Sequence, residues 1–330
     1  MALSRRAVAL RALGLGDVLT VVPALRALRR GLPEHELVLA APDAVSELLV
    51  APDLVDRVLP ASGLGSLDWS GPPPEVAVDL HGSGPESHRL LLALHPGRLV
   101  AFACPALGTV GPDWHSGEHE VHRWCRLVEE AGWPADPLAL GVAPTRERSP
   151  GPGAVVVHPG AAHPSRRWPA QRFAAVAAWA RDAGHHVVLT GSTDEVGLAH
   201  GVARRAGLSE DDVLAGRTDL ATLSALVAGA RLVVCGDTGI AHLASAHRTP
   251  SVVLFGPVPP SEWGPPVVGP HTVLWHGDRR AAAGGRGNPF GDEVDPALAA
   301  ITAGEVIDAA SNRLRQEQAR LDGEGPANVA

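Results

Sequence analysis

The first half of the chain alternates between short apolar runs and segments whose apolar residues recur at helical spacing. Short apolar runs bounded by glycine or polar residues predict buried strands, whereas the longer periodic segments predict amphipathic helices. The predicted strands span residues 8–10, 37–40, 76–80 and 99–103. The predicted helices span residues 18–30, 43–50, 87–94 and 118–131. Repeated strand–helix units with short connections predict a parallel sheet covered by helices on both faces.

The second half repeats this alternation after a segment of different composition. Residues 143–153 read APTRERSPGPG, which has no apolar periodicity and several helix breakers, so we place an interdomain linker there. Predicted strands follow at residues 154–157, 186–189, 213–214, 232–235 and 251–255. Predicted helices lie at residues 169–183, 193–206, 220–228, 240–246 and 302–321. Residues 257–300 are rich in proline and glycine and predict a loop or lid.

These patterns predict an α/β protein with two doubly wound, Rossmann-like domains that face a central cleft. The length of 330 residues agrees, because one hydrophobic core seldom serves so long a chain. We place the first domain at residues 1–145, the second at residues 153–300, and a C-terminal helix with a frayed tail at residues 301–330. Ligands of such sheets bind at the carboxyl ends of the strands, so the candidate chemistry is expected in the loops there.

Charge and residue content exclude several classes of function. The formal net charge of −8 argues against nucleic acid as a partner. The chain contains no lysine and no tyrosine. Their absence rules out a Schiff-base lysine and the Tyr–Lys pair that some nicotinamide enzymes use.

The cysteines indicate a reducing compartment. Cys104, Cys125 and Cys235 are odd in number and widely spaced, so they predict neither a disulfide framework nor a CxxC metal site. Charged residues and glycines interrupt the apolar stretch near the N-terminus, and the chain has no long uninterrupted apolar run of membrane-spanning length. We therefore expect a cytoplasmic protein, which leaves peripheral contact with a membrane surface open.

The strongest candidate site follows the fourth predicted strand of the second half and reads Gly236-Asp237-Thr238-Gly239. A strand, a tight turn and a helix start present free backbone N–H groups beside the positive end of a helix dipole. Such a turn is a site for phosphate. We expect Asp237, Thr238 and His242 to surround an anion bound there.

Other strand ends of the second half carry polar residues suited to the same ligand. His158 begins a small-residue turn that leads to a pair of arginines including Arg166, and a turn with an adjacent cation suits a diphosphate. Thr190 and Glu195 follow another strand, where the carboxylate would accept hydrogen bonds from a ribose. Thr218 precedes a helix and would line a base pocket. For each segment, ordinary capping or packing is the structural alternative.

In the first half, Gly14-Leu15-Gly16-Asp17 follows the first predicted strand. An aspartate at a strand edge that faces a cleft is well placed to act as a general base. A dinucleotide site would need a third small residue at position 19, where this chain has leucine, so the NAD interpretation is disfavoured. Stabilisation of the following helix start by Asp17 is the structural alternative.

A stripe of histidines and one cysteine raises the question of a metal. His115, His119, His122 and Cys125 are spaced i, i+4, i+7 and i+10, so they fall along one side of a predicted helix. A single stripe over three turns cannot close four ligands around one ion. We therefore expect no metal site.

Taken in order, these motifs resemble those of the family 9 glycosyltransferases, which include the ADP-heptose:lipopolysaccharide heptosyltransferases. The resemblance runs over nearly the whole chain, through ALRALGLGDVLTVVPALRALR, DLHGSG, HPGAAHPSRRWPAQRFAAV, LTGSTDE and GRTDLATLSALVAGARLVVCGDTGIAHLASA. It implies two Rossmann-like domains of the GT-B type and an inverting, metal-independent mechanism. It also implies that the second half binds a nucleotide-sugar.

The resemblance further implies roles for individual residues. Asp17 stands where the family's proposed base removes the proton of the acceptor hydroxyl. Arg166 stands where many members have lysine, which keeps the charge but changes the geometry. The resulting substrate-binding candidates are Gly16, His158, Arg166, Thr190, Glu195, Thr218, Asp237, Thr238, Gly239 and His242.

We therefore expect a transferase that moves a heptose-like sugar from ADP-heptose, as co-substrate, to an acceptor hydroxyl, with no cofactor. The first half lacks a basic excess, so the acceptor class stays open among a polysaccharide, a lipopolysaccharide-like glycan and a small metabolite. Two alternative functions also stay open. One is a nucleotide-sugar epimerase of the same fold, and the other is a non-catalytic nucleotide-sugar binding protein.

Overall fold

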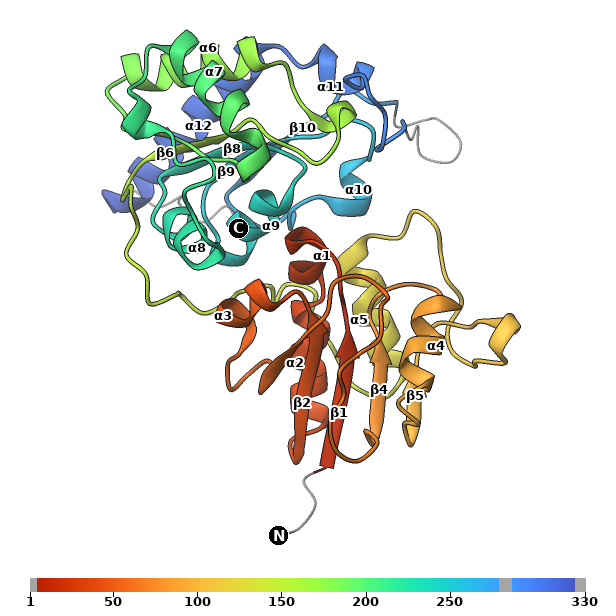
Figure 1. The fold of residues 1–330 in the computed structure, drawn as a ribbon. Helices are drawn as coiled ribbons and strands as arrows, with labels where there is room; N and C mark the ends of the chain where they lie inside the picture. The colour runs from red at the N-terminus through yellow and green to blue at the C-terminus, as the bar shows by residue number, and fades with distance from the viewer. Residues whose placement is uncertain (1–4, 279–286, 324–330) are drawn as a thin grey trace. The chain divides into compact units, whose positions relative to one another are not determined.

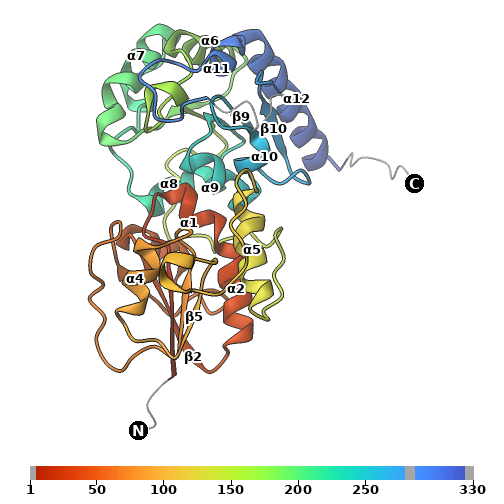
Figure 2. The ribbon, with the colours of Figure 1, turned by 90° about the vertical axis from the view of Figure 1, so that its right-hand side faces the viewer.

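The computed structural model of this chain describes residues 5–278 and 287–323. The chain divides into two compact units between Thr145 and Arg146. Figures 1 and 2 show that each unit is a sheet layered between helices. The frayed tail expected at the C-terminus falls outside the described residues from position 324 onward. In the described ranges, no helix combines the length and apolar character needed to cross a membrane.

A five-stranded parallel sheet forms the centre of the first unit, in the order β3-β2-β1-β4-β5. The strands are β1 (Arg5–Leu10), β2 (His35–Ala41), β3 (Arg57–Pro60), β4 (Val76–Asp79) and β5 (Arg98–Val100). The α-helices are α1 (Leu15–Thr20), α2 (Val22–Gly31), α3 (Ser46–Leu49), α4 (Glu86–Leu92) and α5 (Glu120–Glu130). The strand order reverses between β1 and β4, and ligands of doubly wound sheets bind at such a switch point.

Strand β1 takes the central position because it is apolar toward both faces of the sheet. Val8, Ala9 and Leu10 are fully buried, as a strand covered by helices on both sides must be. Val8 lies opposite Val38 of β2 on one side and Ala77 of β4 on the other. The loop after β1 is therefore flanked by the carboxyl ends of its two neighbours.

The helix expected at residues 18–30 begins earlier and is interrupted. Helix α1 begins at Leu15 with Gly14 as its N-cap. Asp17 therefore lies in the first helical turn, whereas the sequence had predicted that it precedes the helix. The chain leaves helical bonding at Val21, and α2 follows with Pro23 in its first turn. Proline lacks the N–H that a continuous helix would need there, which explains the interruption.

The second unit contains another five-stranded parallel sheet, in the order β10-β9-β8-β6-β7. The strands are β6 (Val155–His158), β7 (Val187–Leu189), β8 (Leu232–Gly236), β9 (Ser251–Leu254) and β10 (His271–Leu274). The α-helices are α6 (Ala170–Asp182), α7 (Val196–Ala206), α8 (Leu220–Ala228), α9 (Gly239–His247), α10 (Pro260–Trp263), α11 (Pro296–Ala300) and α12 (Ala303–Leu321). Strand β8 is central, so the loop after it lies at the middle of the carboxyl edge.

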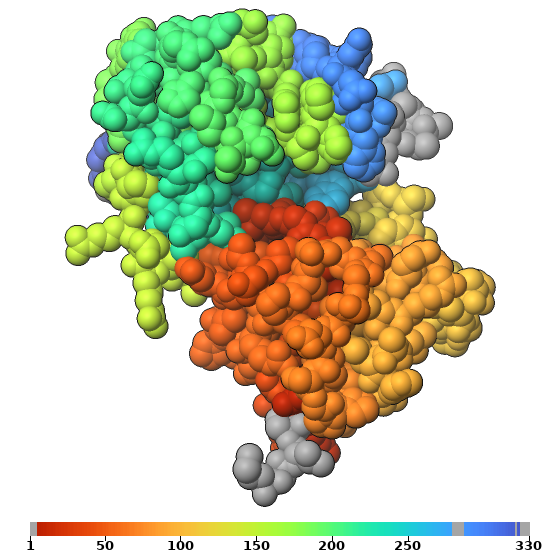
Figure 3. Space-filling model, in the orientation of Figure 1, coloured from red at the N-terminus to blue at the C-terminus, as the bar shows by residue number. Residues whose placement is uncertain are grey.

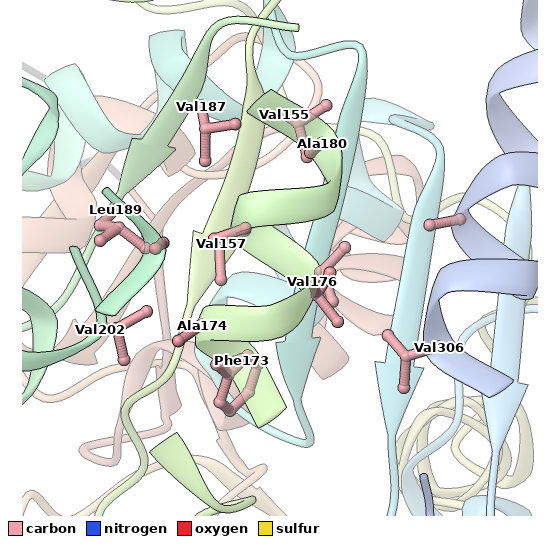
Figure 4. Packing of buried hydrophobic residues seen from close by; sticks show 14 of the residues in the cluster. Val155, Val157, Phe173, Ala174, Val176, Ala180, Val187, Leu189, Val202 and Val306 are labelled. Carbon is pink, nitrogen blue, oxygen red and sulfur yellow. The ribbon is translucent and has the colours of Figure 1, made fainter. Parts of the chain in front are cut away.

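The core of the second unit lies between the sheet and helices α6, α7 and α12. Figure 4 shows valines of β6 and β7 packed beneath α6, where Phe173 and Val176 point toward the sheet. The Trp168 ring meets Phe173 edge-on with centroids 4.9 Å apart, and its Nε1 donates to the Ile301 carbonyl oxygen at 3.0 Å. Trp168 therefore ties the start of α6 to the residues just before α12.

Two strands at sheet edges, β3 and β10, escape the sequence pattern, although the other two edge strands, β5 and β7, were predicted. Strands β3 and β10 each pair on one side only, and β10 is half-buried throughout, so neither needs a continuous apolar run. The prediction of a loop or lid over residues 257–300 is accordingly wrong in part, since this segment holds β10, α10 and α11. The strand expected at residues 213–214 is reduced to an isolated bridge between Val213 and Leu189.

His271 on β10 makes the stability of the second unit depend on pH. Burial, together with the nearby Arg313 and Arg248, lowers the pKa of His271 from its usual 6.5 to about 4. Between these values the unfolded chain binds a proton that the folded unit does not, so stability is full above pH 6.5 and is lost as the pH falls.

We expect His271→Gln to weaken this dependence. Glutamine keeps a hydrogen-bonding group near Ser251 Oγ, which lies 2.8 Å from His271 Nδ1, but it does not titrate. Between pH 7 and pH 5 the free energy of unfolding should fall by about 1 kcal/mol less in the variant than in the wild type, after allowance for the partial exposure of His271. Urea titrations at both pH values measure this difference, and equal losses in the two proteins would contradict it.

Candidate functional site

The turn after β8 joins the central strand of the second unit to helix α9. Thr238 is the N-cap of α9 and has an extended backbone, but its side chain does not cap the helix. Across residues 5–278 and 287–323, the buried Thr238 Oγ1 has no hydrogen-bond partner. The helix start therefore presents backbone N–H groups and a hydroxyl, all of which can donate to an anion.

Arg166 and Asp237 form an ion pair beside this turn. Arg166 Nη2 lies 2.9 Å from Asp237 Oδ2 and also donates to the Asp237 carbonyl oxygen. Asp237 is 6% exposed, and burial raises the pKa of its carboxyl group while Arg166 opposes that rise. The Arg166 side chain is 27% exposed, so part of the guanidinium can reach a ligand. Gly236 allows the close approach, because a Cβ there would lie 3.3 Å from the Arg166 carbonyl oxygen.

His158, Thr190 and Glu195 gather at the ends of β6 and β7. His158 Nδ1 lies 3.0 Å from Thr190 Oγ1, and its Nε2 lies 4.0 Å from Glu195 Oε2. Burial lowers the pKa of His158 although Glu195 opposes this, so the imidazole is neutral near pH 7. Glu195 Oε2 also accepts a hydrogen bond from the Ser192 N–H in a capping box. Capping was the structural alternative to ribose binding in the sequence analysis. Gly160 leaves room for the carboxylate, since a Cβ there would lie 2.2 Å from it.

The remaining predicted residues of the second unit lie around these two groups. Gly239 is the first residue of α9, and His242 on the same helix meets the Trp263 ring edge-on with centroids 5.9 Å apart. Thr218 is half-buried and follows Gly216, whose φ of +70° favours glycine. Among the contacts of the described residues, none joins Thr218 to Arg166, Asp237 or His158.

Sequence reasoning missed a late segment that packs on the loop carrying Arg166. The Ser165 N–H donates to the Gly291 carbonyl oxygen at 3.1 Å, and the His163 and Phe290 rings meet edge-on at 5.1 Å. Figure 3 shows the yellow-green and blue segments of the second unit adjoining on its surface. The sequence signal is weak, because the two segments are far apart in the chain and the contact uses backbone groups.

In the first unit, Asp17 and Gly16 lie on α1 directly after the central strand. The Asp17 carbonyl oxygen accepts from Arg11 Nε at 3.0 Å and from Thr20 Oγ1 at 2.6 Å. Asp17 Oδ1 lies 3.3 Å from Arg11 Nη2, and the Asp17 side chain is 34% exposed. Asp17 is thus a fixed carboxylate that a substrate can still reach.

A buried pair at the end of β4 also escaped the sequence analysis. Asp79 Oδ1 accepts from the His81 N–H at 2.8 Å, and Oδ2 lies 3.4 Å from His88 Nε2. Both side chains are fully buried, and burial raises the pKa of Asp79 and lowers that of His88. The DLHGSG motif contains Asp79, but its partner lies beyond the motif on α4. The pair shapes the loop at this edge of the first sheet.

The histidine and cysteine stripe does not gather around one point. His119 is the N-cap of α5 and accepts from the Val121 N–H through Nδ1, while its ring packs against His122. Cys125 is buried in an apolar cluster, and burial raises the pKa of its thiol to about 12. Within residues 5–278 and 287–323, no group of three or more His, Cys, Asp or Glu side chains is arranged to hold a metal ion.

Comparison with known proteins places the chain in a family. The family described as glycosyltransferase family 9 (heptosyltransferase) matches residues 113–284, just over half of the chain. This chain belongs to glycosyltransferase family 9. The resemblance that the sequence motifs indicated is therefore confirmed. The matched region includes Arg166, Glu195 and the β8–α9 turn of the second unit.

Curated relatives with heptosyltransferase names agree with this assignment. The lipooligosaccharide heptosyltransferase 2 of Haemophilus ducreyi is 36% identical over 111 residues, which cover 32% of this chain and 31% of that protein. The chain thus spans about a third of the length of these curated relatives.

Solved structures extend the likeness to nearly the whole chain. The family 9 glycosyltransferase of Veillonella parvula has a TM-score of 0.75 at 19% identity, over 94% of this chain and 97% of that one. The ADP-heptose lipopolysaccharide heptosyltransferase II of E. coli has a TM-score of 0.71 at 19% identity, over 95% and 99%. The predicted α/β class with two doubly wound parallel sheets is confirmed.

Proposed function

We propose that this chain is an inverting, metal-independent glycosyltransferase that moves a heptose-like sugar from ADP-heptose to an acceptor hydroxyl. Membership of family 9 supports the sugar class and the type of reaction. The observation that carries the proposal is the β8–α9 turn. A helix N-terminus, a buried hydroxyl and a partly exposed guanidinium meet there, and these are the groups that bind a sugar diphosphate.

The second domain, proposed as residues 153–300, binds the donor. Negative charge grows on the departing diphosphate, and the α9 N–H groups, Thr238 and Arg166 stabilise it without a metal ion. Asp237 holds the Arg166 guanidinium beside the turn through the ion pair. Further donor contacts are proposed for His158, Thr190, Glu195, Thr218, Gly239 and His242.

The first domain, proposed as residues 1–145, binds the acceptor beside Gly16. Asp17 accepts the proton of the acceptor hydroxyl as its oxygen forms a bond to the anomeric carbon. The bond from that carbon to the diphosphate oxygen breaks on the opposite face, so the configuration inverts and ADP leaves. The C-terminal helix, within residues 301–330, serves the second domain as a structural cover.

The acceptor is proposed to be a glycan or a small metabolite in the cytoplasm. The three cysteines are free and buried, which suits a reducing compartment. A lipid-linked glycan would bring the enzyme into peripheral contact with a membrane, whereas nucleic acid is not a proposed partner.

A ligand panel followed by a transfer assay tests the proposal. ADP-heptose should raise the melting temperature more than GDP-mannose or UDP-glucose, since a ligand at about 100 times its Kd stabilises the folded state by about 2.7 kcal/mol. With an acceptor, ADP should be released in the presence of EDTA, and the product should carry the inverted anomeric configuration. Conversion of the donor without acceptor would indicate an epimerase instead. Binding without turnover on any acceptor would indicate a binding protein.

A further inference from the structure

A buried arginine connects Asp17 to an acidic residue on helix α5. Arg11 directly follows β1, and its side chain is 1% exposed. One nitrogen, Nη2, lies 3.3 Å from Asp17 Oδ1 and 2.8 Å from Glu120 Oε1. Nη2 carries two N–H donors and also lies 3.4 Å from Thr20 Oγ1. The two carboxylates therefore bind to the same nitrogen, so the position of Glu120 bears on the contact with Asp17.

The other donors of Arg11 fix the plane of its guanidinium. Nε donates to the Asp17 carbonyl oxygen at 3.0 Å, and Nη1 donates to the Leu80 carbonyl oxygen at 2.8 Å, just after β4. The group also lies 4.7 Å from the centroid of the Trp124 ring. Arginine presents five donors in fixed directions, a pattern that lysine cannot reproduce. Groups from α1, α5 and the end of β4 thus jointly orient Arg11.

Glu120 is held equally firmly from its other side. Its Oε1 accepts from Trp124 Nε1 at 2.9 Å, and its Oε2 accepts from Arg123 Nη1. Glu120 is 5% exposed, and Arg123 has a second acidic neighbour in Glu118 at 3.9 Å. Burying such a group of charges costs much of the attraction it gains, so stability alone accounts poorly for it. A role in fixing conformation accounts for it better.

We propose that Arg11, clamped by Glu120, is a positioning residue that fixes the direction of the Asp17 carboxylate. The inference rests on the proposed function, in which Asp17 is the base. Proton transfer needs the base within about 2.6–3.2 Å of the hydroxyl oxygen, and a misplacement of about 1 Å costs about 10²-fold in rate. Burial and the nearby Arg11 lower the pKa of His81 to about 4. The His81 ring is therefore neutral near pH 7 and does not compete with Arg11 for the two carboxylates.

The first test is Arg11→Lys, which keeps the charge and removes the fork of donors. We expect kcat to fall about 10²-fold while the KM for the donor stays within about two-fold. Arg29→Lys is the matched control, because Arg29 likewise joins a carboxylate, Asp56, to carbonyl oxygens, those of Leu32 and His35. Arg29 lies near the start of β2, at the other end of the sheet, and its variant should keep kcat. Equal losses in the two variants would overturn the proposal.

A double-variant cycle separates positioning from a purely structural role. If Arg11 acts through Asp17, adding Arg11→Lys to Asp17→Asn should change the residual kcat by less than about two-fold. An equal fold-loss in both backgrounds would mean that Arg11 supports the fold or another group, and the proposal would fail.

The Glu120 clamp has its own readout. Glu120→Gln removes one of the two negative charges that share Arg11 Nη2, so Asp17 gains a larger part of the guanidinium's attraction. The acid limb of the kcat/KM profile should then move to lower pH by about half a unit to one unit, and an unmoved limb would contradict the clamp.

Failure of the proposed function gives a different pattern. If the wild type transfers no sugar, or if Asp17→Asn is fully active, the assignment of the base is wrong. A crystal structure of Arg11→Lys then decides the positioning claim without an assay. A displaced Asp17 carboxylate supports it, and an unmoved one overturns it.

Discussion

Replacing Asp17 by asparagine is expected to lower kcat about 10³-fold while leaving the affinity for ADP-heptose within about two-fold. The amide has nearly the same shape, and its oxygen can still accept from Arg11 Nη2, which lies 3.3 Å from Asp17 Oδ1 in the wild type. The amide is too weak a base, however, to accept the proton of the acceptor hydroxyl. Single-turnover transfer measures the chemical step, and calorimetric titration with the donor measures affinity.

Asp43→Asn provides the matched control for Asp17→Asn. Asp43 is an exposed aspartate that begins the 3₁₀ turn Asp43–Val45 after β2, so it lies near the same edge of the first sheet. Its replacement should leave transfer within about two-fold of the wild type. Full activity of Asp17→Asn would remove Asp17 from the role of base. Comparable losses in both variants would indicate that the edge needs negative charge rather than one base.

Hydrophobic periodicity predicted the central elements of both units because burial there is complete. Residues 7–10 of β1, 76–78 of β4, 155–157 of β6 and 232–235 of β8 are apolar and buried, and their runs in the sequence are continuous. An edge strand can lack such a run, as β3 and β10 do, although the edge strands β5 and β7 kept theirs. The interruption at Val21 is a local effect of backbone chemistry at Pro23, which a count of apolar spacing does not register.

Site residues were predictable where one loop supplies several groups, and missed where distant segments meet. The turn at residues 236–239 is visible in the sequence because strand, glycine and helix start follow one another. The hydrogen bond between Arg11 and Glu120 joins residues 109 positions apart, so the spacing of residues in the sequence could not predict it. Glu195 shows the opposite problem, since its motif fitted two roles and the structure shows it engaged in capping through Oε2.

Replacing Arg166 by methionine is expected to weaken the binding of ADP and ADP-heptose about 10²-fold. Arg166 is the cation beside the α9 turn, and charge-assisted bonds to phosphate are about twice as strong as neutral ones. Each factor of ten in affinity corresponds to about 1.4 kcal/mol, so the loss amounts to about 2.8 kcal/mol. Calorimetric titration measures it directly. Arg166→Lys keeps the charge but lacks the forked guanidinium, so its affinity should lie between those of the wild type and Arg166→Met. Unchanged affinity in Arg166→Met would contradict the proposed donor site.

The same variant should reveal the state of Asp237 through pH. Burial raises the pKa of this carboxyl group, and contacts with Arg166 oppose the rise, so removing the guanidinium raises the pKa further. When the pKa of a carboxyl group is higher in the folded protein than in the unfolded chain, its protonated form stabilises the folded state. That contribution to the free energy of unfolding is lost as the pH rises through the folded pKa. Arg166→Met should therefore lose melting temperature relative to the wild type as the pH rises above 3.8, the ordinary pKa of the carboxyl group. Arg167→Met is the control, since Arg167 Nε donates to the Ala161 carbonyl oxygen at 2.7 Å, and its loss should not follow pH. Parallel melting profiles for Arg166→Met and wild type would mean that the guanidinium does not govern Asp237.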